Sequence, residues 1–117
     1  MYKISKQFSF SASHILNMPR ADHPCARMHG HNYLITIHLK SKELNRFGFV
    51  KDYNELNTVK KFIDETLDHR HLNDVIPANP TSENIARFIY ERFKPDFPEL
   101  YAVEVSETPK TSCLYEP

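Results

Sequence analysis

The chain has 117 residues, a length at which a single domain over residues 1–117 is expected. Fifteen basic and fifteen acidic residues cancel, so no net charge attracts nucleic acid or an anionic membrane surface. Two cysteines are too few for a disulfide framework, which favours a reduced, cytoplasmic setting. No apolar run approaches the length of a membrane span, and residues 1–3 lead into a strand pattern rather than a signal peptide.

The first strongly patterned segment is residues 4–14, which we expect to form a strand. Its apolar side chains alternate onto one face, namely Ile4, Phe8, Phe10 and Ala12. His14 has the same parity and stands at the end of this segment. A loop with two prolines, at residues 18–24, separates it from a second predicted strand at about residues 30–42.

The start of the second strand is rich in metal-binding side chains. Residues 25–33 are Cys-Ala-Arg-Met-His-Gly-His-Asn-Tyr. Side chains two residues apart in a strand point to the same face, so His29 and His31 project together from the face that carries Tyr33. Two adjacent imidazoles suit a divalent metal such as zinc, which favours nitrogen and sulfur ligands. A His-x-His sequence alone also occurs where both rings are simply solvated.

A first helix is expected after the second strand. A break in the pattern is followed by a short extended piece at Phe49–Val50 and by a capping-box sequence at Asp52–Glu55. Apolar residues at helical spacing then continue to about Leu67, so the helix should end there. Residues 68–74 are polar and aperiodic, as in a loop or a loosened helix end.

The last third of the chain is expected to hold a second helix and two more strands. The helix begins with Thr81 or Ser82 as its cap, and Lys94-Pro95 ends it. Alternating apolar residues predict a third strand at residues 101–106 and a short fourth strand at residues 112–115. The order strand, strand, helix, helix, strand, strand predicts an α+β fold, in which a four-stranded antiparallel sheet carries both helices on one face.

Pairing of the first two strands would bring three histidines together. If these strands are antiparallel neighbours, the end of one lies beside the start of the next, and His14 then faces His29 and His31. Three imidazoles with an open fourth position describe a catalytic zinc site. Cys25 leaves two interpretations open: a fourth ligand that closes a structural site, or a free thiol near the cation that acts as base or nucleophile.

Two carboxylates are further candidates for chemistry. Asp68-His69 resembles a carboxylate that orients an imidazole for acid–base catalysis. Adjacent side chains in a loop need not touch, however, and His71 is a second candidate for the same role. Glu107 keeps the parity of Val105, which places a carboxylate at the end of an apolar strand face unless it is a surface residue just past the strand. A buried carboxylate needs paired donors, and a ligand with two parallel N–H groups would supply them.

Five segments, in order, resemble the 6-pyruvoyltetrahydropterin synthase superfamily: residues 10–14, 25–33, 67–69, 80–83 and 105–108. The resemblance covers nearly the whole chain. It implies the family's tunnelling fold, in which the sheets of several subunits assemble into a barrel with active sites at subunit interfaces. Only three residues separate Cys25 from His29. This spacing resembles the carboxy-forming, queuosine-pathway branch, since the pyruvoyl-forming branch generally has a longer gap.

The resemblance assigns the metal ligands and the base. His14, His29 and His31 match the family's zinc ligands, in agreement with the parity of the two predicted strands. Cys25 matches the catalytic proton acceptor rather than a fourth ligand. The implied cofactor is therefore zinc, held by three histidines.

The remaining site residues are implied in the same way. His69 matches the histidine that works with the cysteine, and Asp68 matches the aspartate that supports it. Glu107 matches the carboxylate that binds the pterin ring, whose N3–H and 2-amino group are parallel donors. Thr81 and Ser82 fall in the segment that lines the pterin pocket, although their role as helix cap explains them equally well.

The resemblance also implies the reaction. The substrate of this branch is 7,8-dihydroneopterin triphosphate, a small molecule that is converted to 6-carboxytetrahydropterin with release of acetaldehyde and triphosphate. Cations for the triphosphate are available at Arg20, Arg27 and Lys51. Two alternatives remain. One is a sister activity, pyruvoyl-forming or aldolase-like, and the other is a non-catalytic zinc-binding module, which would leave Cys25, His69 and Glu107 without a role.

Overall fold

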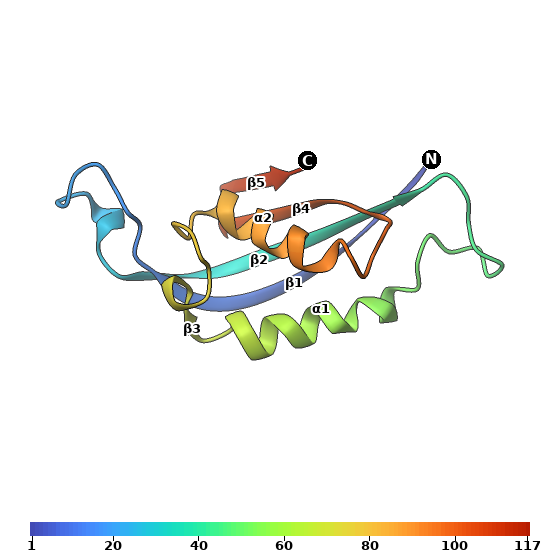
Figure 1. The fold of residues 1–117 in the computed structure, drawn as a ribbon, viewed down its shortest axis with the longest axis horizontal. Coiled ribbons are helices and arrows are strands. Elements are labelled where there is room, and N and C mark those ends of the chain that lie inside the picture. The colour runs from blue at the N-terminus through green and yellow to red at the C-terminus, as the bar shows by residue number, and fades with distance from the viewer.

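The computed structural model describes all residues 1–117 and contains one five-stranded sheet. The strands lie in the order β3-β1-β2-β4-β5, with the bounds β1 Tyr2–His14, β2 His29–Ser41, β3 Arg70–His71, β4 Leu100–Thr108 and β5 Thr111–Tyr115. β1 and β2 run along the long axis of a molecule that measures 56 × 25 × 25 Å (Figure 1). The loop that joins them lies at one end of the molecule, beyond both helices.

The four-stranded antiparallel sheet predicted from the sequence is incomplete. β1, β2, β4 and β5 are antiparallel as expected, but β3 adds a fifth strand that pairs with β1 in parallel. Residues 68–74, predicted as a loop or a loosened helix end, contain this strand and a 3₁₀ turn at Leu72–Asp74. Two residues cannot display a period of two, so only pairing with the open edge of β1 makes this stretch a strand.

Pairing of β1 with β2 is continuous over the full length of both strands. The register runs from Tyr2 opposite Ser41 to His14 opposite His29. The face predicted to be apolar is the buried one, and Tyr33 is almost fully buried on it. Because the register is continuous, the end of β1 is fixed beside the start of β2, which is what brings their histidines together.

The first helix forms where it was predicted, but it changes type along its length. Asp52 Oδ1 accepts from the N–H of Asn54 at 2.9 Å and so caps a 3₁₀ turn at Tyr53–Leu56. α1 follows at Asn57–Phe62, and a π-helical turn at Ile63–Leu67 completes the helix. A π turn within a helix is rare and is found mostly at functional sites.

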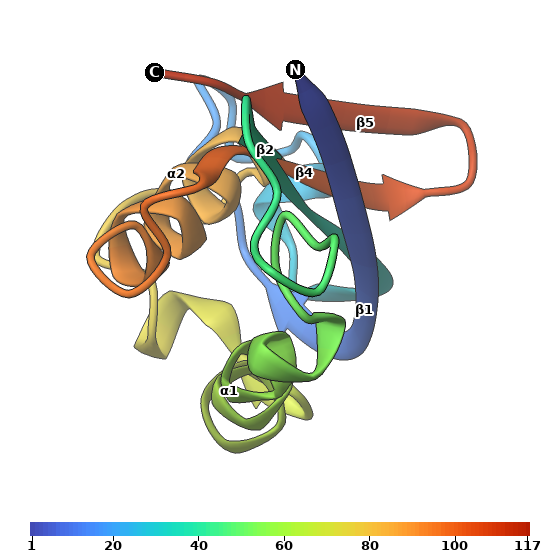
Figure 2. The ribbon, with the colours of Figure 1, turned by 90° about the vertical axis from the view of Figure 1, so that its right-hand side faces the viewer.

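The second helix, α2, spans Ser82–Phe93, and Lys94 ends it as predicted. Of the two predicted caps, Thr81 serves, because its Oγ1 accepts from the N–H of Asn84 at 3.1 Å. α1 and α2 cover the same face of the sheet (Figure 2), and one apolar core fills the space between the layers. Fully buried side chains of this core include Ile35, Ile37, Leu39, Leu56, Ile63, Leu67, Ile85 and Ile89. Each contributes about 1.5–3 kcal/mol relative to exposure.

The extended piece predicted at Phe49–Val50 is absent. Asn45 Oδ1 accepts from the N–H groups of Phe47 and Phe49, at 2.9 and 3.0 Å, and folds this segment into a turn. Gly48 has a φ of 88° within that turn, a conformation that favours glycine. No helix in the structure has the length and apolarity needed to cross a membrane.

Candidate metal centre and active site

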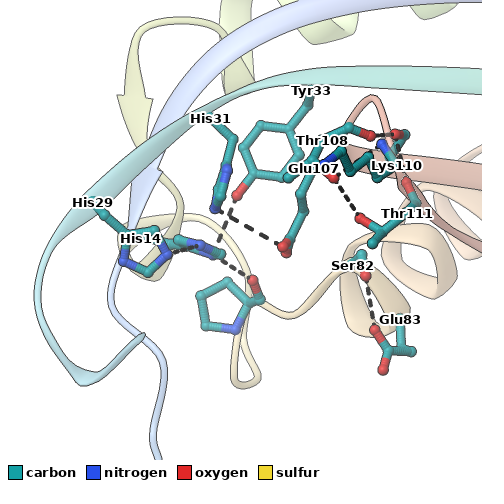
Figure 3. Close-up of polar contacts among 12 residues, drawn as sticks. His14, His29, His31, Tyr33, Ser82, Glu83, Glu107, Thr108, Lys110 and Thr111 are labelled. Carbon is teal, nitrogen blue, oxygen red and sulfur yellow. Dashed lines mark hydrogen bonds and ion pairs between the residues drawn. The ribbon is translucent and has the colours of Figure 1, made fainter. Parts of the chain in front are cut away.

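Three histidines converge at one end of the β1–β2 hairpin. His14 lies directly opposite His29 in the register, and His31 follows two residues later in β2. One ring nitrogen from each lies within 4.8 Å of the others, so together they could hold a metal ion (Figure 3). The predicted three-histidine cluster is confirmed, and Cys25 is not part of it.

The hydrogen bonds of these rings leave lone pairs for a cation. His14 Nδ1 lies 2.8 Å from the carbonyl oxygen of Pro80, and His29 Nδ1 lies 2.8 Å from that of Arg27. A carbonyl only accepts, so each Nδ1 carries the proton and each Nε2 keeps a lone pair. The two Nε2 atoms face each other at 2.8 Å, and His31 Nε2 is buried without a hydrogen-bond partner. Facing lone pairs repel, so this set of donors fits a bound divalent metal.

Burial favours the metal-binding form of His14. Its side chain is fully buried, and this desolvation lowers the pKa of the imidazole, with the charges of His29 and His31 acting in the same direction. The hydrogen bond to Pro80 and the Glu107 carboxylate act in the opposite direction. A neutral imidazole is the form that binds a metal.

β4 brings Glu107 to the same place. Its Oε2 lies 3.9 Å from His31 Nε2, on the face predicted from the parity of the strand (Figure 3). The carboxylate is partly buried, and no hydrogen bond from the protein reaches it. Its oxygens are therefore available to accept from a ligand bound beside the histidines.

Tyr33 also belongs to this site, although the sequence presents it only as an apolar residue of the strand. Its hydroxyl lies 3.2 Å from His14 Nδ1. Burial raises the pKa of this phenol, and the charge of Glu107 acts in the same direction, so the hydroxyl stays protonated. The signal that identifies Tyr33 is its position two residues after His31 on the same face.

The Asp68–His69 pair forms as predicted, on an unusual backbone. Asp68 Oδ2 lies 2.9 Å from His69 Nδ1, and Asp68 Oδ1 accepts from the N–H of Ser11 at 2.9 Å. The N–H of Asp68 closes the π turn on the carbonyl of Ile63 at 2.8 Å. His69 then has a φ of 58°, a conformation that no other non-glycine residue of the chain adopts. Such strain costs about 1–3 kcal/mol and is concentrated at functional sites.

The charge of Asp68 suits the orientation of an imidazole. The N–H of Ser11, followed by His69, holds the pKa of the Asp68 carboxyl below its ordinary value of 3.8. The resulting carboxylate accepts a hydrogen bond from the N–H at Nδ1 of His69 and leaves Nε2 free. His71 instead has its Nδ1 2.9 Å from the hydroxyl of Ser13. Of the two candidate histidines, His69 is the one that a carboxylate orients.

Asp68 and His69 do not join the three histidines within one chain. The polar contacts of their side chains are with the N–H of Ser11 and with each other. The His69 side chain is 82% exposed, and it lines an open groove of about 490 Å³ together with Arg70, His71 and His31 of the cluster. The two halves of the predicted catalytic machinery are thus not in polar contact within one chain.

Cys25 lies in the loop between β1 and β2, in a 3₁₀ turn at Pro24–Ala26. Its N–H donates to Nδ1 of His23 at 3.0 Å, and its carbonyl accepts from the N–H of Leu16 at 2.9 Å. The thiol is free and half-buried. These bonds fix the backbone of Cys25 near the start of β2, and its catalytic role stays a prediction.

The predicted substrate-binding residues lie at the start of α2. Thr81 Oγ1 is engaged as the helix cap, and the Ser82 hydroxyl donates to Glu83 Oε1 at 2.8 Å. They are connected to the histidine cluster through Pro80, whose carbonyl binds His14. Their contact with a pterin stays a prediction.

The three cations considered for the triphosphate differ in their surroundings. Arg20 and Lys51 each form an ion pair with a carboxylate, at 2.8 and 3.2 Å. Arg27 forms no ion pair, and its carbonyl accepts from His29. Arg27 is therefore the cation that is both unpaired and adjacent to the cluster.

A sheet with two helices on one face and three histidines at its end defines an α+β domain with a cluster that could hold a metal ion. The chain belongs to the 6-pyruvoyl tetrahydropterin synthase family, whose model matches residues 3–117. It is 32% identical to the 6-carboxy-5,6,7,8-tetrahydropterin synthase of Haemophilus influenzae, over 99% of both chains. It is 34% identical to the Synechocystis protein of that name, over 98% of this chain and 93% of the relative.

The fold agrees with this family. The structure of 6-pyruvoyl tetrahydropterin synthase from Caenorhabditis elegans superposes with a TM-score of 0.87 at 28% identity. The superposition covers 99% of this chain and 95% of that one. The expected family resemblance is thus confirmed both in sequence and in structure.

Proposed function

We propose that the protein is a zinc-dependent carbon–carbon lyase. It converts 7,8-dihydroneopterin triphosphate and water to 6-carboxy-5,6,7,8-tetrahydropterin, acetaldehyde and triphosphate, a step of queuosine biosynthesis. The observation that carries the proposal is the convergence of His14, His29 and His31 beside Glu107, whose carboxylate accepts no hydrogen bond from the protein. The names of the relatives at 32% and 34% identity support the carboxy-forming reaction, as does the short spacing from Cys25 to His29.

Glu107 is the group that would bind the pterin. The ring N3–H and 2-amino group are parallel donors, which match the two oxygens of a carboxylate. Because Glu107 lies 3.9 Å from His31, a ring held there presents its side chain to the three histidines. Thr81 and Ser82, at the start of α2, are further candidates for contact with the pterin.

The chain supplies a base and a proton carrier for the reaction. Zinc bound by the three histidines would stabilise the negative charge that develops on the substrate as a proton leaves carbon. Cys25, as thiolate, is the proposed base that removes this proton. His69 passes protons onward through Nε2, while Asp68 keeps the proton of the ring on Nδ1.

The active site is proposed to lie between subunits of a homo-oligomer. His69 is exposed, Asp68 is half-buried, and neither forms a hydrogen bond or ion pair with the cluster of its own chain, so we assign His69 of a second copy to a given metal centre. The sheet has edges that a second copy can pair with, because β5 has no outer neighbour and β3 covers only two residues of β1. Arg27 is the proposed partner of the substrate's triphosphate.

Product analysis tests the proposal. Zinc-loaded protein is incubated with 7,8-dihydroneopterin triphosphate, and acetaldehyde and the pterin product are followed by mass. Acetaldehyde together with a carboxylated pterin is the expected result. Pyruvoyltetrahydropterin without acetaldehyde would assign the sister activity, and no conversion by zinc-replete protein would leave a zinc-binding module.

A further inference from the structure

Two asparagine side chains tie the segment after β1 to the loop before α2. Asn73 Oδ1 accepts from the N–H of Ile15 at 2.8 Å, and its Nδ2 donates to the carbonyl of the same residue at 2.8 Å. Asn79 contacts Asn17 in the same way, at 2.8 and 3.2 Å. Each side-chain amide therefore binds both backbone polar groups of one residue.

The side-chain amides of Asn73 and Asn79 extend the hydrogen bonding along the β3 edge of β1, beyond the last backbone pair between these strands. β3 pairs with β1 only as far as Ser13. Ile15 and Asn17 follow at steps of two, so their backbone groups face the same edge. A side-chain amide carries a donor and an acceptor, as a peptide group does, so Asn73 and Asn79 take the place of a partner strand there.

His14 lies within this tied region. Its Nδ1 donates to the carbonyl of Pro80 at 2.8 Å, and Pro80 directly follows Asn79. The carbonyl of Asn79 in turn accepts from Nδ2 of Asn84 in the first turn of α2, at 2.8 Å. Pro80 is buried and is held from both sides, by Asn79 before it and by the helix cap Thr81 after it.

We infer that Asn73 and Asn79 are positioning residues of the metal centre. By fixing the loop before α2 against the end of β1, they hold the Pro80 carbonyl on His14 Nδ1. The proton then stays on Nδ1, and the lone pair of Nε2 points toward the other histidines. The inference rests on the metal centre of the proposed function but not on its substrate.

The test uses substitutions that keep the size of the side chain. Asn79→Asp and Asn73→Asp retain the accepting oxygen but replace the donor by an oxygen that faces a carbonyl. Asn57→Asp is the matched control, because it makes the same charge change at an exposed residue whose side chain forms no hydrogen bond. Zinc affinity is measured by titration against a competing chelator. We expect Asn79→Asp to raise the Kd for zinc about 10–100-fold, and Asn57→Asp to leave it unchanged.

A second readout separates positioning from loop stability. The ¹⁵N resonances of His14 report its tautomer in metal-free protein at about pH 8, where the ring is neutral. Wild-type protein should carry the proton on Nδ1, and Asn79→Asp should give a mixture of tautomers. A folded Asn79→Asp protein with a lower melting temperature, but with the wild-type tautomer and Kd for zinc, would overturn the inference.

Hydrogen exchange of the unsubstituted protein tests the same coupling if the variants fail to fold. Coupling of binding free energies is reciprocal, so zinc should increase protection of the Ile15 and Asn17 amides that the two asparagines bind. Equal protection with and without zinc would contradict the inference. None of these measurements involves turnover, so a lack of lyase activity would remove the proposed function and leave these results intact.

Discussion

The three-histidine cluster and the Asp68–His69 pair differ in how completely one chain builds them. His14, His29 and His31 are brought together by one continuous hairpin, and backbone carbonyls orient two of their rings. Asp68 and His69 are oriented just as well, by Ser11 and by each other, but the His69 ring is 82% exposed. The cluster has three ring nitrogens close enough to hold an ion, whereas the pair is an ordered group whose histidine ring is exposed.

This difference agrees with separate roles for the two groups, in which the three histidines bind the metal and His69 has the proposed role in proton transfer. A metal centre on paired strands is preorganised, because the register of the whole hairpin fixes the spacing of the rings. A strained, exposed histidine can act in the reaction only when a substrate or a second subunit contacts its ring. Substitutions can separate metal binding from turnover, and mixed oligomers can show whether a second subunit completes the site.

The largest effect is expected for His29→Ala. Loss of one of three ligands should weaken zinc binding by more than about 100-fold, which exceeds the loss of affinity expected for residues that only hydrogen-bond a ligand. Turnover should be lost as well. Zinc content after gel filtration is the measurement. His38→Ala is the control, since His38 lies on the opposite face of β2, 3.6 Å from Glu104. Full zinc occupancy in His29→Ala would refute the three-histidine centre.

Cys25→Ala should keep zinc but lose turnover. Removal of a general base costs about 10²–10⁴-fold in rate, while the metal ligands of the centre are unchanged. Zinc content and the rate of acetaldehyde release are measured on the same sample. If Cys25→Ala loses zinc instead, the cysteine is a ligand and the centre is structural.

His69→Ala should lower turnover by about 100-fold, with zinc binding unchanged. His71→Ala, two residues away with its ring near the Ser13 hydroxyl, is the matched control and should have a smaller effect.

Mixed oligomers sharpen this experiment. Co-expression of His29→Ala and His69→Ala chains should restore activity above that of either variant, because some interfaces then combine intact histidines from one chain with His69 from another. Activity that stays at the level of the parent variants would place all of these residues in one subunit's site.

The smallest effect concerns stability at low pH. The pKa of Asp68 is below its ordinary value of 3.8 in the folded chain, so its ionised form stabilises the fold above that pH. This contribution is lost as the pH falls from about 3.8 through the lowered pKa. Urea midpoints of wild-type protein and Asp68→Asn should therefore differ near neutral pH and converge in acid. An equal difference at both pH values would show that the Asp68 charge does not stabilise the fold.

The sequence predicted the core of the metal centre because strand parity is a local property. The alternation of residues 4–14 placed His14 on the buried face, and the same alternation placed His29, His31 and Tyr33 on the buried face of β2. Glu107 followed from its parity with Val105. Both helices were also found, since apolar spacing and capping residues are read over one or two turns.

Tertiary structure decided which backbone groups these side chains meet. No local pattern indicates that the Pro80 carbonyl binds His14, that Ser11 binds Asp68, or that Arg70–His71 adds a strand to β1. Parity states which face a side chain occupies, but the partner of an edge N–H or a loop carbonyl depends on how distant segments pack. The residue types of the metal centre are thus a property of the sequence alone. The orientation of its rings, and the lack of polar contact between them and His69, are properties of the fold.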